Sequence, residues 1–304
     1  MESRGLPAVP IEMRLRIVQS ESAAAPQRRD VFAASAPGFD VAARTDVGRR
    51  RSNNEDNFSV VPELGLFVLS DGMGGEAAGE LASKITVEEI PRHMKEAARD
   101  GPAVMGEANP QFSALTNHLG GAIRRSNRVI WEAAQHHASQ RGMGATVVAA
   151  VLRQPVLSVA HVGDSRIYLL RDGELQQLTQ DHSLVMEQVR RGLITREEAE
   201  HSDMANIIVR ALGAEETVKV DLDEVYVMPG DHVVLCSDGL TKMIPDDGIA
   251  QVVAEAESAQ QASERLVDIA NDAGGEDNIT VVVVRIKEDT RKGLWGWLKG
   301  LLKW

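Results

Sequence analysis

The sequence predicts an α+β fold, a four-layer α-β-β-α sandwich in which two packed antiparallel β-sheets are flanked by helix pairs. Strand-like and helix-like segments interleave along the 304 residues, but without the regular alternation that builds a parallel sheet. Hydrophobic residues make up 43% of the chain and charged residues 26%, as in a globular domain. Because aromatic residues contribute only 4%, aliphatic side chains must form most of the core.

The first predicted strands form a hairpin, and two long helices follow it. Residues 58–61 and 66–69 are apolar and enclose the sequence Pro-Glu-Leu-Gly, a combination typical of two strands around a tight turn. Residues 76–98 and 110–138 carry apolar residues at helical spacing. This region therefore supplies one pair of strands and one helix pair.

A second group of strands begins after these helices. It comprises four strand-like runs at 145–152, 156–162, 167–170 and 174–178. Residues 183–212 are polar with a helical pattern, and we interpret them as an inserted helical subdomain. A strand at 231–236, helices within 246–272 and a strand at 279–286 complete the second half. Such strand groups, with helices from both halves of the chain, pack naturally as two sheets covered by helices.

The two ends of the chain differ from the domain between them, which we place at 39–287. Residues 1–38 are rich in Ala, Pro, Ser and Arg and predict a flexible N-terminal leader. Residues 288–304 form a basic amphipathic tail in which, from 291 to 304, Leu and Trp share one helical face and lysines lie opposite. Two roles stay open for this tail: docking to a membrane surface or a partner, and packing on its own domain.

Composition narrows the partners and the compartment. A formal net charge of -12 argues against binding of nucleic acid, which requires a basic face. The single cysteine, Cys236, excludes an intrachain disulfide and favours a reducing compartment. No segment reaches the roughly 20 apolar residues needed to cross a bilayer, and the N-terminus lacks the pattern of a signal peptide. We therefore expect a cytoplasmic monomer, with the tail as the one route to the membrane periphery.

Short acidic motifs stand at the margins of the predicted apolar strands. The carboxylates concerned are Glu55, Asp56, Asp71, Asp164, Asp238 and Asp277. Each motif alone has an ordinary explanation, because Asp-Gly is a common turn dipeptide. Together, several carboxylates at neighbouring strand ends would repel one another unless cations neutralised them. Oxygen ligands without a His-x-x-x-His or Cys-x-x-Cys cluster indicate Mg²⁺ or Mn²⁺ rather than Zn²⁺.

Taken in order, these motifs resemble those of the type 2C metal-dependent serine/threonine protein phosphatase family, over residues 39–287. The matching segments are Thr45-Asp46-Val47-Gly48 with Arg51, Asn54-Glu55-Asp56, Ser70-Asp71-Gly72-Met73-Gly74-Gly75, Gly144-Ala145-Thr146, Val162-Gly163-Asp164-Ser165-Arg166, Cys236-Ser237-Asp238-Gly239-Leu240 and Gly275-Glu276-Asp277-Asn278-Ile279-Thr280. Met73 stands where many eukaryotic members carry a histidine that is a proposed general acid, so the chain is similar to the bacterial branch. The resemblance implies hydrolysis of phosphoserine and phosphothreonine in proteins, and an opposing serine/threonine kinase as a signalling partner.

The resemblance also implies a binuclear Mn²⁺ or Mg²⁺ centre, with two cations per chain, that activates a hydroxide. By position, Asp71, Asp238 and Asp277 match the family's direct metal ligands. The carbonyl of Gly72 matches the group that completes the second site, and Asp164 matches a ligand of a weaker third metal in bacterial members.

The remaining matched positions concern water, phosphate and specificity. Glu55 and Asp56 match residues that reach metal-bound waters, and Arg51 matches the arginine that grips the phosphate. Lys242 stands where many members have an acid, a departure that brings a cation near the region of the third metal. Segment 183–212 matches the family's flap, where we expect substrate specificity to reside.

Other interpretations stay open at this point. A two-metal hydrolase of small phosphoesters or nucleotides would need the same ligands, and only the resemblance favours proteins as substrates. A pseudophosphatase would keep the fold as a binding module, but the intact Asp71, Asp238 and Asp277 disfavour it. Arg51 could also be an ordinary exposed member of the basic run 49–51.

Overall fold

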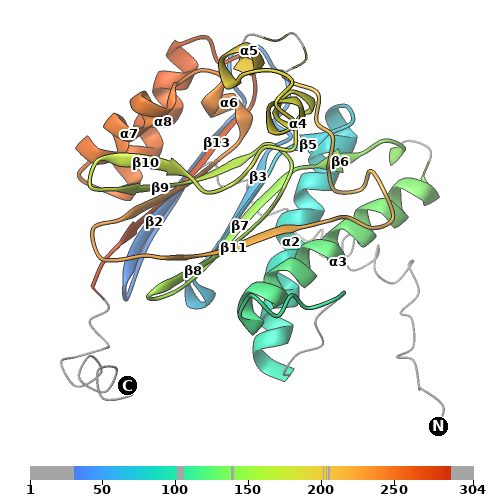
Figure 1. Cartoon of the computed structure of the whole chain (residues 1–304), viewed down its shortest axis with the longest axis horizontal. Helices are drawn as coiled ribbons and strands as arrows, with labels where there is room; N and C mark the ends of the chain where they lie inside the picture. The colour runs from blue at the N-terminus through green and yellow to red at the C-terminus, as the bar shows by residue number, and fades with distance from the viewer. Residues whose placement is uncertain are drawn as a thin grey trace. The chain divides into compact units, whose positions relative to one another are not determined.

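The computed structural model describes residues 31–100, 106–137, 140–200, 202, 204 and 206–288. The first 30 residues of the predicted leader and the predicted tail role at 291–304 lie outside the described residues. Within the described part, two large antiparallel sheets carry helices on their outer faces (Figure 1). The predicted four-layer α-β-β-α sandwich is therefore confirmed.

The first sheet has six strands, each antiparallel to its neighbours. Their order is β1 (Val31–Ala36), β2 (Phe39–Asp46), β13 (Ile279–Ile286), β12 (His232–Cys236), β9 (Arg166–Arg171) and β10 (Glu174–Gln177). The register pairs Val282 of β13 with Ala43 of β2 on one side and with Leu235 of β12 on the other. The last strand of the described residues thus lies in the centre of this sheet.

The second sheet has five strands, also antiparallel. Their order is β11 (Asp221–Tyr226), β8 (Val156–Val162), β7 (Val147–Arg153), β4 (Leu66–Ser70) and β3 (Asn57–Val61). The predicted hairpin is the pair β3 and β4, joined through the short 3-10 helix η1 (Pro62–Leu64) and Gly65 in the left-handed conformation. A separate two-stranded sheet pairs β5 (Gly72–Met73) with β6 (Gly144–Ala145).

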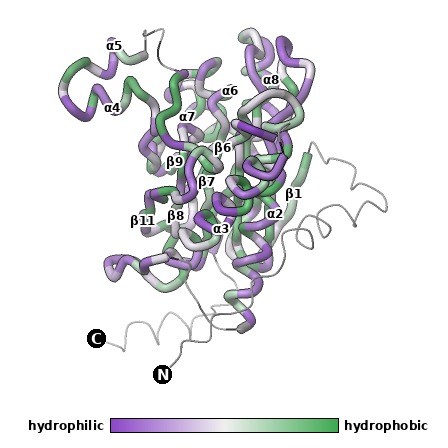
Figure 2. The backbone as a smooth tube through the Cα atoms, turned by 90° about the vertical axis from the view of Figure 1, so that its right-hand side faces the viewer, coloured by the Kyte–Doolittle hydropathy of each residue, from purple (hydrophilic) through white to green (hydrophobic). Residues whose placement is uncertain are grey.

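Helices cover the outer faces of both sheets. The five-stranded sheet shares a hydrophobic cluster with α2 (Glu76–Asp100) and α3 (Ala114–His136). The six-stranded sheet packs in the same way on α6 (Asp238–Thr241), α7 (Asp246–Glu255) and α8 (Ala259–Asp272). Two short helices, α4 (Leu184–Arg190) and α5 (Arg196–Glu200), stand away from these layers (Figure 2). Among the described residues, every helix falls short of the length and apolar character that crossing a membrane requires.

A third hydrophobic cluster fills the space between the two sheets. It includes Phe39 and Phe67, whose rings meet edge to face with centroids 5.4 Å apart. Along β13, Val281 joins the cluster under the helices, whereas Val282 joins the cluster between the sheets. A strand buried on both faces needs apolar residues at consecutive positions, and this explains the valine runs of the sequence.

The structure differs from the sequence prediction at three strands and in the inserted segment. β1 occupies residues of the predicted leader, and its half-buried Phe32 packs against the core, so residues 31–36 are part of the sheet. Neither β2 nor β11 is part of the sequence prediction. Among the described residues of 183–212, only those of α4 and α5 are helical.

Candidate metal centre

The predicted acidic motifs meet at one end of the sandwich, where β4 and β12 end and β13 begins. They line a cleft of about 450 Å³. Its lining consists of Arg51, Glu55, Asp71, Gly72, Met73, Gly74, Gly75, Asn206, Ile208, Asp238, Lys242, Asp277 and Asn278. Two predicted site residues, Asp56 and Asp164, are not in this lining, because both are buried behind it.

Asp71 is held at the end of β4 by the backbone and side chain of Thr146. The Asp71 N–H donates to Thr146 Oγ1 at 3.1 Å, and the Asp71 carbonyl accepts from the Thr146 N–H at 2.8 Å. The next residue, Gly72, lies against α2: a Cβ there would stand 2.0 Å from the Gly79 carbonyl oxygen, so a larger residue does not fit. The turn after β4 therefore brings the carboxylate and the following backbone to the cleft.

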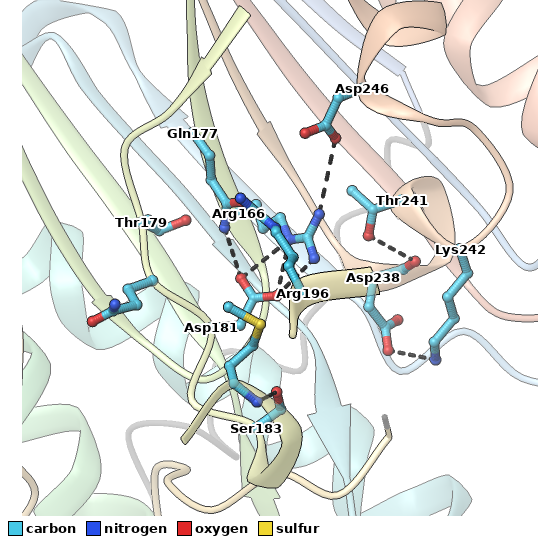
Figure 3. A network of polar contacts seen from close by, with 12 residues as sticks. Arg166, Gln177, Thr179, Asp181, Ser183, Arg196, Asp238, Thr241, Lys242 and Asp246 are labelled. Atoms are coloured by element: carbon cyan, nitrogen blue, oxygen red, sulfur yellow. Dashed lines mark hydrogen bonds and ion pairs between the residues drawn. The ribbon is translucent and has the colours of Figure 1, made fainter. Parts of the chain in front are cut away.

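Asp238 and Asp277 come from the other sheet. Asp238 opens α6 with one residue between it and the end of β12, and Asp277 precedes β13. Lys242 Nζ lies 2.5 Å from Asp238 Oδ2 and 3.6 Å from Asp277 Oδ2, and Figure 3 shows this lysine directed toward Asp238. Arg51 Nη2 donates to Asp277 Oδ2 at 2.9 Å. Two cationic side chains of the protein thus lie against these carboxylates.

Asn278, to which the sequence prediction gives no role, connects two loops of the site through its side-chain hydrogen bonds. Its Oδ1 accepts from the Glu55 N–H at 2.8 Å. Its Nδ2 donates to the carbonyls of Val47 and Asn53, both at 2.9 Å. The loop between β2 and β3 is thereby fixed to the start of β13. The sequence signal for this residue is its place in the last acidic motif.

Asp56 lies beneath the cleft and is only 1% exposed. Its Oδ2 accepts from Ser237 Oγ at 2.8 Å. Burial raises the pKa of Asp56 to about 7, although hydrogen bonds with Thr280 and Ser237 oppose the shift. The negative charges of Asp238 and Asp277 add to it.

The same crowding affects Asp71 and Asp164. Burial raises the pKa of Asp71 well above its usual range, and the charges of Asp56 and Asp238 raise it further. Burial, followed by the charge of Asp238, raises the pKa of Asp164 to about 7. Asp164, which follows β8, therefore interacts electrostatically with the cluster. Carboxylates gathered in this way can all be ionised only beside additional positive charge.

Divalent cations fit this cluster. Within the described part of the chain, Asp164 Oδ1 and Asp238 Oδ1 are buried without a hydrogen-bond partner. A buried carboxylate oxygen without a donor is costly, and a cation would remove that cost. Ligands that are all oxygen atoms suit Mg²⁺ or Mn²⁺.

A second group of side chains that could bind a metal lies apart from the cleft. The sequence prediction did not contain it. Ligand atoms of His161, His182 and Asp221 lie within 4.8 Å of one another. Arg210 Nη1, however, lies 2.8 Å from His182 Nε2 and donates to Asp221 Oδ1 at 2.9 Å. The guanidinium already supplies the positive charge there, so we assign no metal to this group. Its members are far apart in the sequence, and no spacing pattern could have revealed it.

An ion pair beside the cleft fixes the chain just before segment 183–212. Arg166 donates to Asp181 through Nε and Nη2, the latter at 2.7 Å (Figure 3). Gln177 Nε2 donates to the same carboxylate at 2.8 Å, and Arg166 Nη1 donates to Tyr168 Oη at 2.9 Å. Burial lowers the pKa of Arg166, but the charge and hydrogen bonds of Asp181 raise it more, so the guanidinium stays charged.

Known proteins are similar to this chain in sequence and in fold. Residues 47–273 match the family Protein phosphatase 2C. The chain is 38% identical over 253 residues to the serine/threonine phosphatase stp of Listeria monocytogenes, which covers 82% of this chain and 96% of the relative. It is 36% identical over 254 residues to the protein phosphatase PhpP of Streptococcus pneumoniae, covering 83% of this chain and 99% of the relative.

Solved structures agree with these relatives. The serine/threonine phosphatase PstP/Ppp of Mycobacterium tuberculosis superposes with a TM-score of 0.73 and 35% identity, covering 83% of this chain and 100% of that structure. A catalytic domain of PstP in complex with two manganese ions superposes with a TM-score of 0.68 and 36% identity, covering 83% and 99%. With the acidic cleft in place, these similarities show that the chain belongs to the protein phosphatase 2C family, in its bacterial branch.

Proposed function

We propose that the chain is a metal-dependent serine/threonine protein phosphatase that uses two Mn²⁺ or Mg²⁺ ions. The observation that carries this proposal is the single cleft that Asp71, Asp238 and Asp277 line together with Arg51. The three aspartates would hold the ions, and the carbonyl of Gly72 would complete the second site. The names of the relatives and the two manganese ions in the PstP structure support this assignment.

The residues of the chain would divide the chemistry as follows. Two such ions, when bound, would lower the pKa of a water toward about 7 and would stabilise the charge that develops on the attacking and leaving oxygens. Arg51 offers a planar pair of donors to the phosphate oxygens. Glu55, which lines the cleft, and Asp56, buried beneath it, would accept hydrogen bonds from water at the site. Met73 lines the cleft but carries no proton to donate to the leaving oxygen.

A covalent mechanism through Cys236 does not fit. The thiol is fully buried, and burial raises its pKa to about 12, so the reactive thiolate is scarce at neutral pH. Its apolar surroundings instead suit a packing role in the cluster under the helices. The free thiol supports the predicted reducing, cytoplasmic compartment; that location and the opposing kinase stay predictions.

Substrate class is tested by comparing phosphate release from a phosphothreonine peptide and from nucleotides, with Mn²⁺ present. We expect a higher kcat/KM on the peptide. Faster hydrolysis of the nucleotides would favour a hydrolase of small phosphoesters. A folded protein that binds Mn²⁺ but hydrolyses neither substrate would favour a pseudophosphatase.

Arg51→Ala should raise KM more than it lowers kcat, because the guanidinium holds the phosphate similarly in the ground state and the transition state. Loss of one charge-assisted contact costs about 1.5–3 kcal/mol, or roughly 10- to 150-fold in KM. Steady-state kinetics on the phosphothreonine peptide measures this. Arg265→Ala, which removes an arginine from α8, should leave KM unchanged. An unchanged KM for Arg51→Ala would make that residue an ordinary surface arginine.

Asp164 and Lys242 should have opposite effects on a weaker third cation. Asp164→Ala should lower turnover while tight binding of two Mn²⁺ persists. Lys242→Asp should strengthen activation at high Mn²⁺, because it removes an ammonium that lies 2.5 Å from Asp238 Oδ2 and repels cations nearby. Titrating activity against Mn²⁺ for the wild type and both variants measures these effects. Superimposable curves would show that neither residue acts on a third cation.

A further inference from the structure

Two arginines on the rim of the cleft have no part in the proposed chemistry. Arg49 and Arg50 precede Arg51 in the loop between β2 and β3, and both are exposed. Within the described residues, neither guanidinium has an ion pair or hydrogen bond, whereas that of Arg51 binds Asp277. Both groups are therefore available to a ligand.

The backbone beneath these arginines is fixed beside the site. The N–H groups of Arg49 and Arg50 both donate to the Gly275 carbonyl, at 2.7 and 3.2 Å. Gly48, with a φ of 82°, approaches so closely that a Cβ would stand 2.2 Å from the Asp277 carbonyl oxygen. The loop is thus clamped against the turn that carries Asp277. The backbone that carries the two arginines is therefore already held next to the cleft, before any ligand binds.

This positive rim contrasts with the rest of the protein. The chain carries 45 acidic and 33 basic residues, yet three consecutive arginines stand here. Glu276, in the facing turn, is exposed and offsets part of this charge. A guanidinium presents paired donors that match the oxygens of a phosphate or a carboxylate. The arginine side chains at this rim are therefore suited to bind anionic groups.

We propose that Arg49 and Arg50 bind a second anionic group of the substrate, next to the phosphorylated residue in the cleft. The inference rests on the proposed phosphatase function. The preferred substrates would be protein segments that carry several phosphates or carboxylates close together. Arg49 and Arg51 are two residues apart, so their Cα atoms are at most about 7 Å from each other. An extended substrate covers the same distance in two residues, so the second group belongs within about two residues of the first.

A peptide series tests this proposal. Each peptide carries one phosphothreonine in the cleft position and, two residues before or after it, threonine, phosphothreonine or glutamate. Phosphate release from the common phosphothreonine is followed by mass spectrometry for the wild type and for R49Q/R50Q. The control K95Q/K287Q removes the same two charges from exposed lysines whose partners lie at the other end of the sheets.

The wild type and the control should prefer the peptide with a second anion by about three- to tenfold in kcat/KM, for one of the two placements. R49Q/R50Q should lose this preference and keep the kcat/KM of the peptide with a single phosphate. Equal preference for phosphate and glutamate would identify a general anion site, and a larger effect of phosphate a second phosphate site. A preference that survives in R49Q/R50Q, or is absent from the wild type, would overturn the inference while the phosphatase function stands. Failure to hydrolyse any phosphopeptide would overturn both.

Discussion

Asp238→Asn is expected to lower phosphatase activity by at least about 100-fold. The change removes one of the three carboxylates proposed to hold the ions, and a bound metal supplies several kcal/mol of stabilisation to the transition state. It also leaves the Lys242 ammonium, 2.5 Å from Asp238 Oδ2, without its nearest counter-charge, so the site becomes more repulsive to cations. Activity on a phosphothreonine peptide across a range of Mn²⁺ concentrations measures the loss.

Asp247→Asn is the matched control for this experiment. Asp247 is exposed in the first turn of α7, outside the cleft lining, and carries the same substitution. It should retain wild-type activity and the wild-type dependence on Mn²⁺. If Asp238→Asn also retained full activity, Asp238 would not be a metal ligand.

Asp181→Ala is expected to lower the free energy of unfolding by about 3 kcal/mol. Removing one partner of a buried ion pair leaves an uncompensated charge, which typically costs about 3–5 kcal/mol. The lower figure applies because the side chain of Arg166 is 23% exposed, whereas that of Asp181 is 8% exposed. The change also deprives Gln177 of its acceptor. Urea denaturation followed by circular dichroism measures the difference.

An exposed ion pair provides the comparison. Glu255 and Arg265 are paired at 3.3 Å with side chains 51% and 41% exposed, so Glu255→Ala should lower the free energy of unfolding much less than Asp181→Ala does. If Asp181→Ala cost no more than Glu255→Ala, the network around Arg166 would not stabilise the fold.

The strands that could be predicted from the sequence are those whose burial or flanking turn produces a recognisable residue pattern. β13 is buried on both faces and reads as consecutive valines, and β3 and β4 frame a recognisable turn. β11 lies at the edge of its sheet and reads Asp-Leu-Asp-Glu-Val-Tyr, with every residue at least partly exposed. Polar edge strands resemble loops in sequence, because only pairing with a neighbour makes them strands. β1 also lies at the edge of its sheet, but it is short and rich in alanine, and only Phe32, Ala34 and Ala36 on one of its faces pack on the core.

The part of the candidate site that could be predicted from the sequence consists of carboxylates near the ends of buried strands. Asp71 and Asp238 come within two residues of the end of a buried strand, and both line the same cleft. The contact of Lys242 with Asp238 depends on the helical turn α6, four residues long, which the sequence prediction did not contain. The clamp made by Asn278 depends on two loops that lie more than 200 residues apart in the chain, and no local pattern reports such a contact.

Calorimetric titration of the metal-stripped protein with Mn²⁺, together with phosphate release from a phosphothreonine peptide at each point, tests the central claim most directly. The account predicts two tightly bound Mn²⁺ per chain, turnover that rises as they bind, and loss of both in Asp238→Asn. EDTA should abolish the turnover again. Full turnover of the metal-stripped protein, or of Asp238→Asn in metal-free buffer, would contradict a mechanism built on Asp71, Asp238 and Asp277.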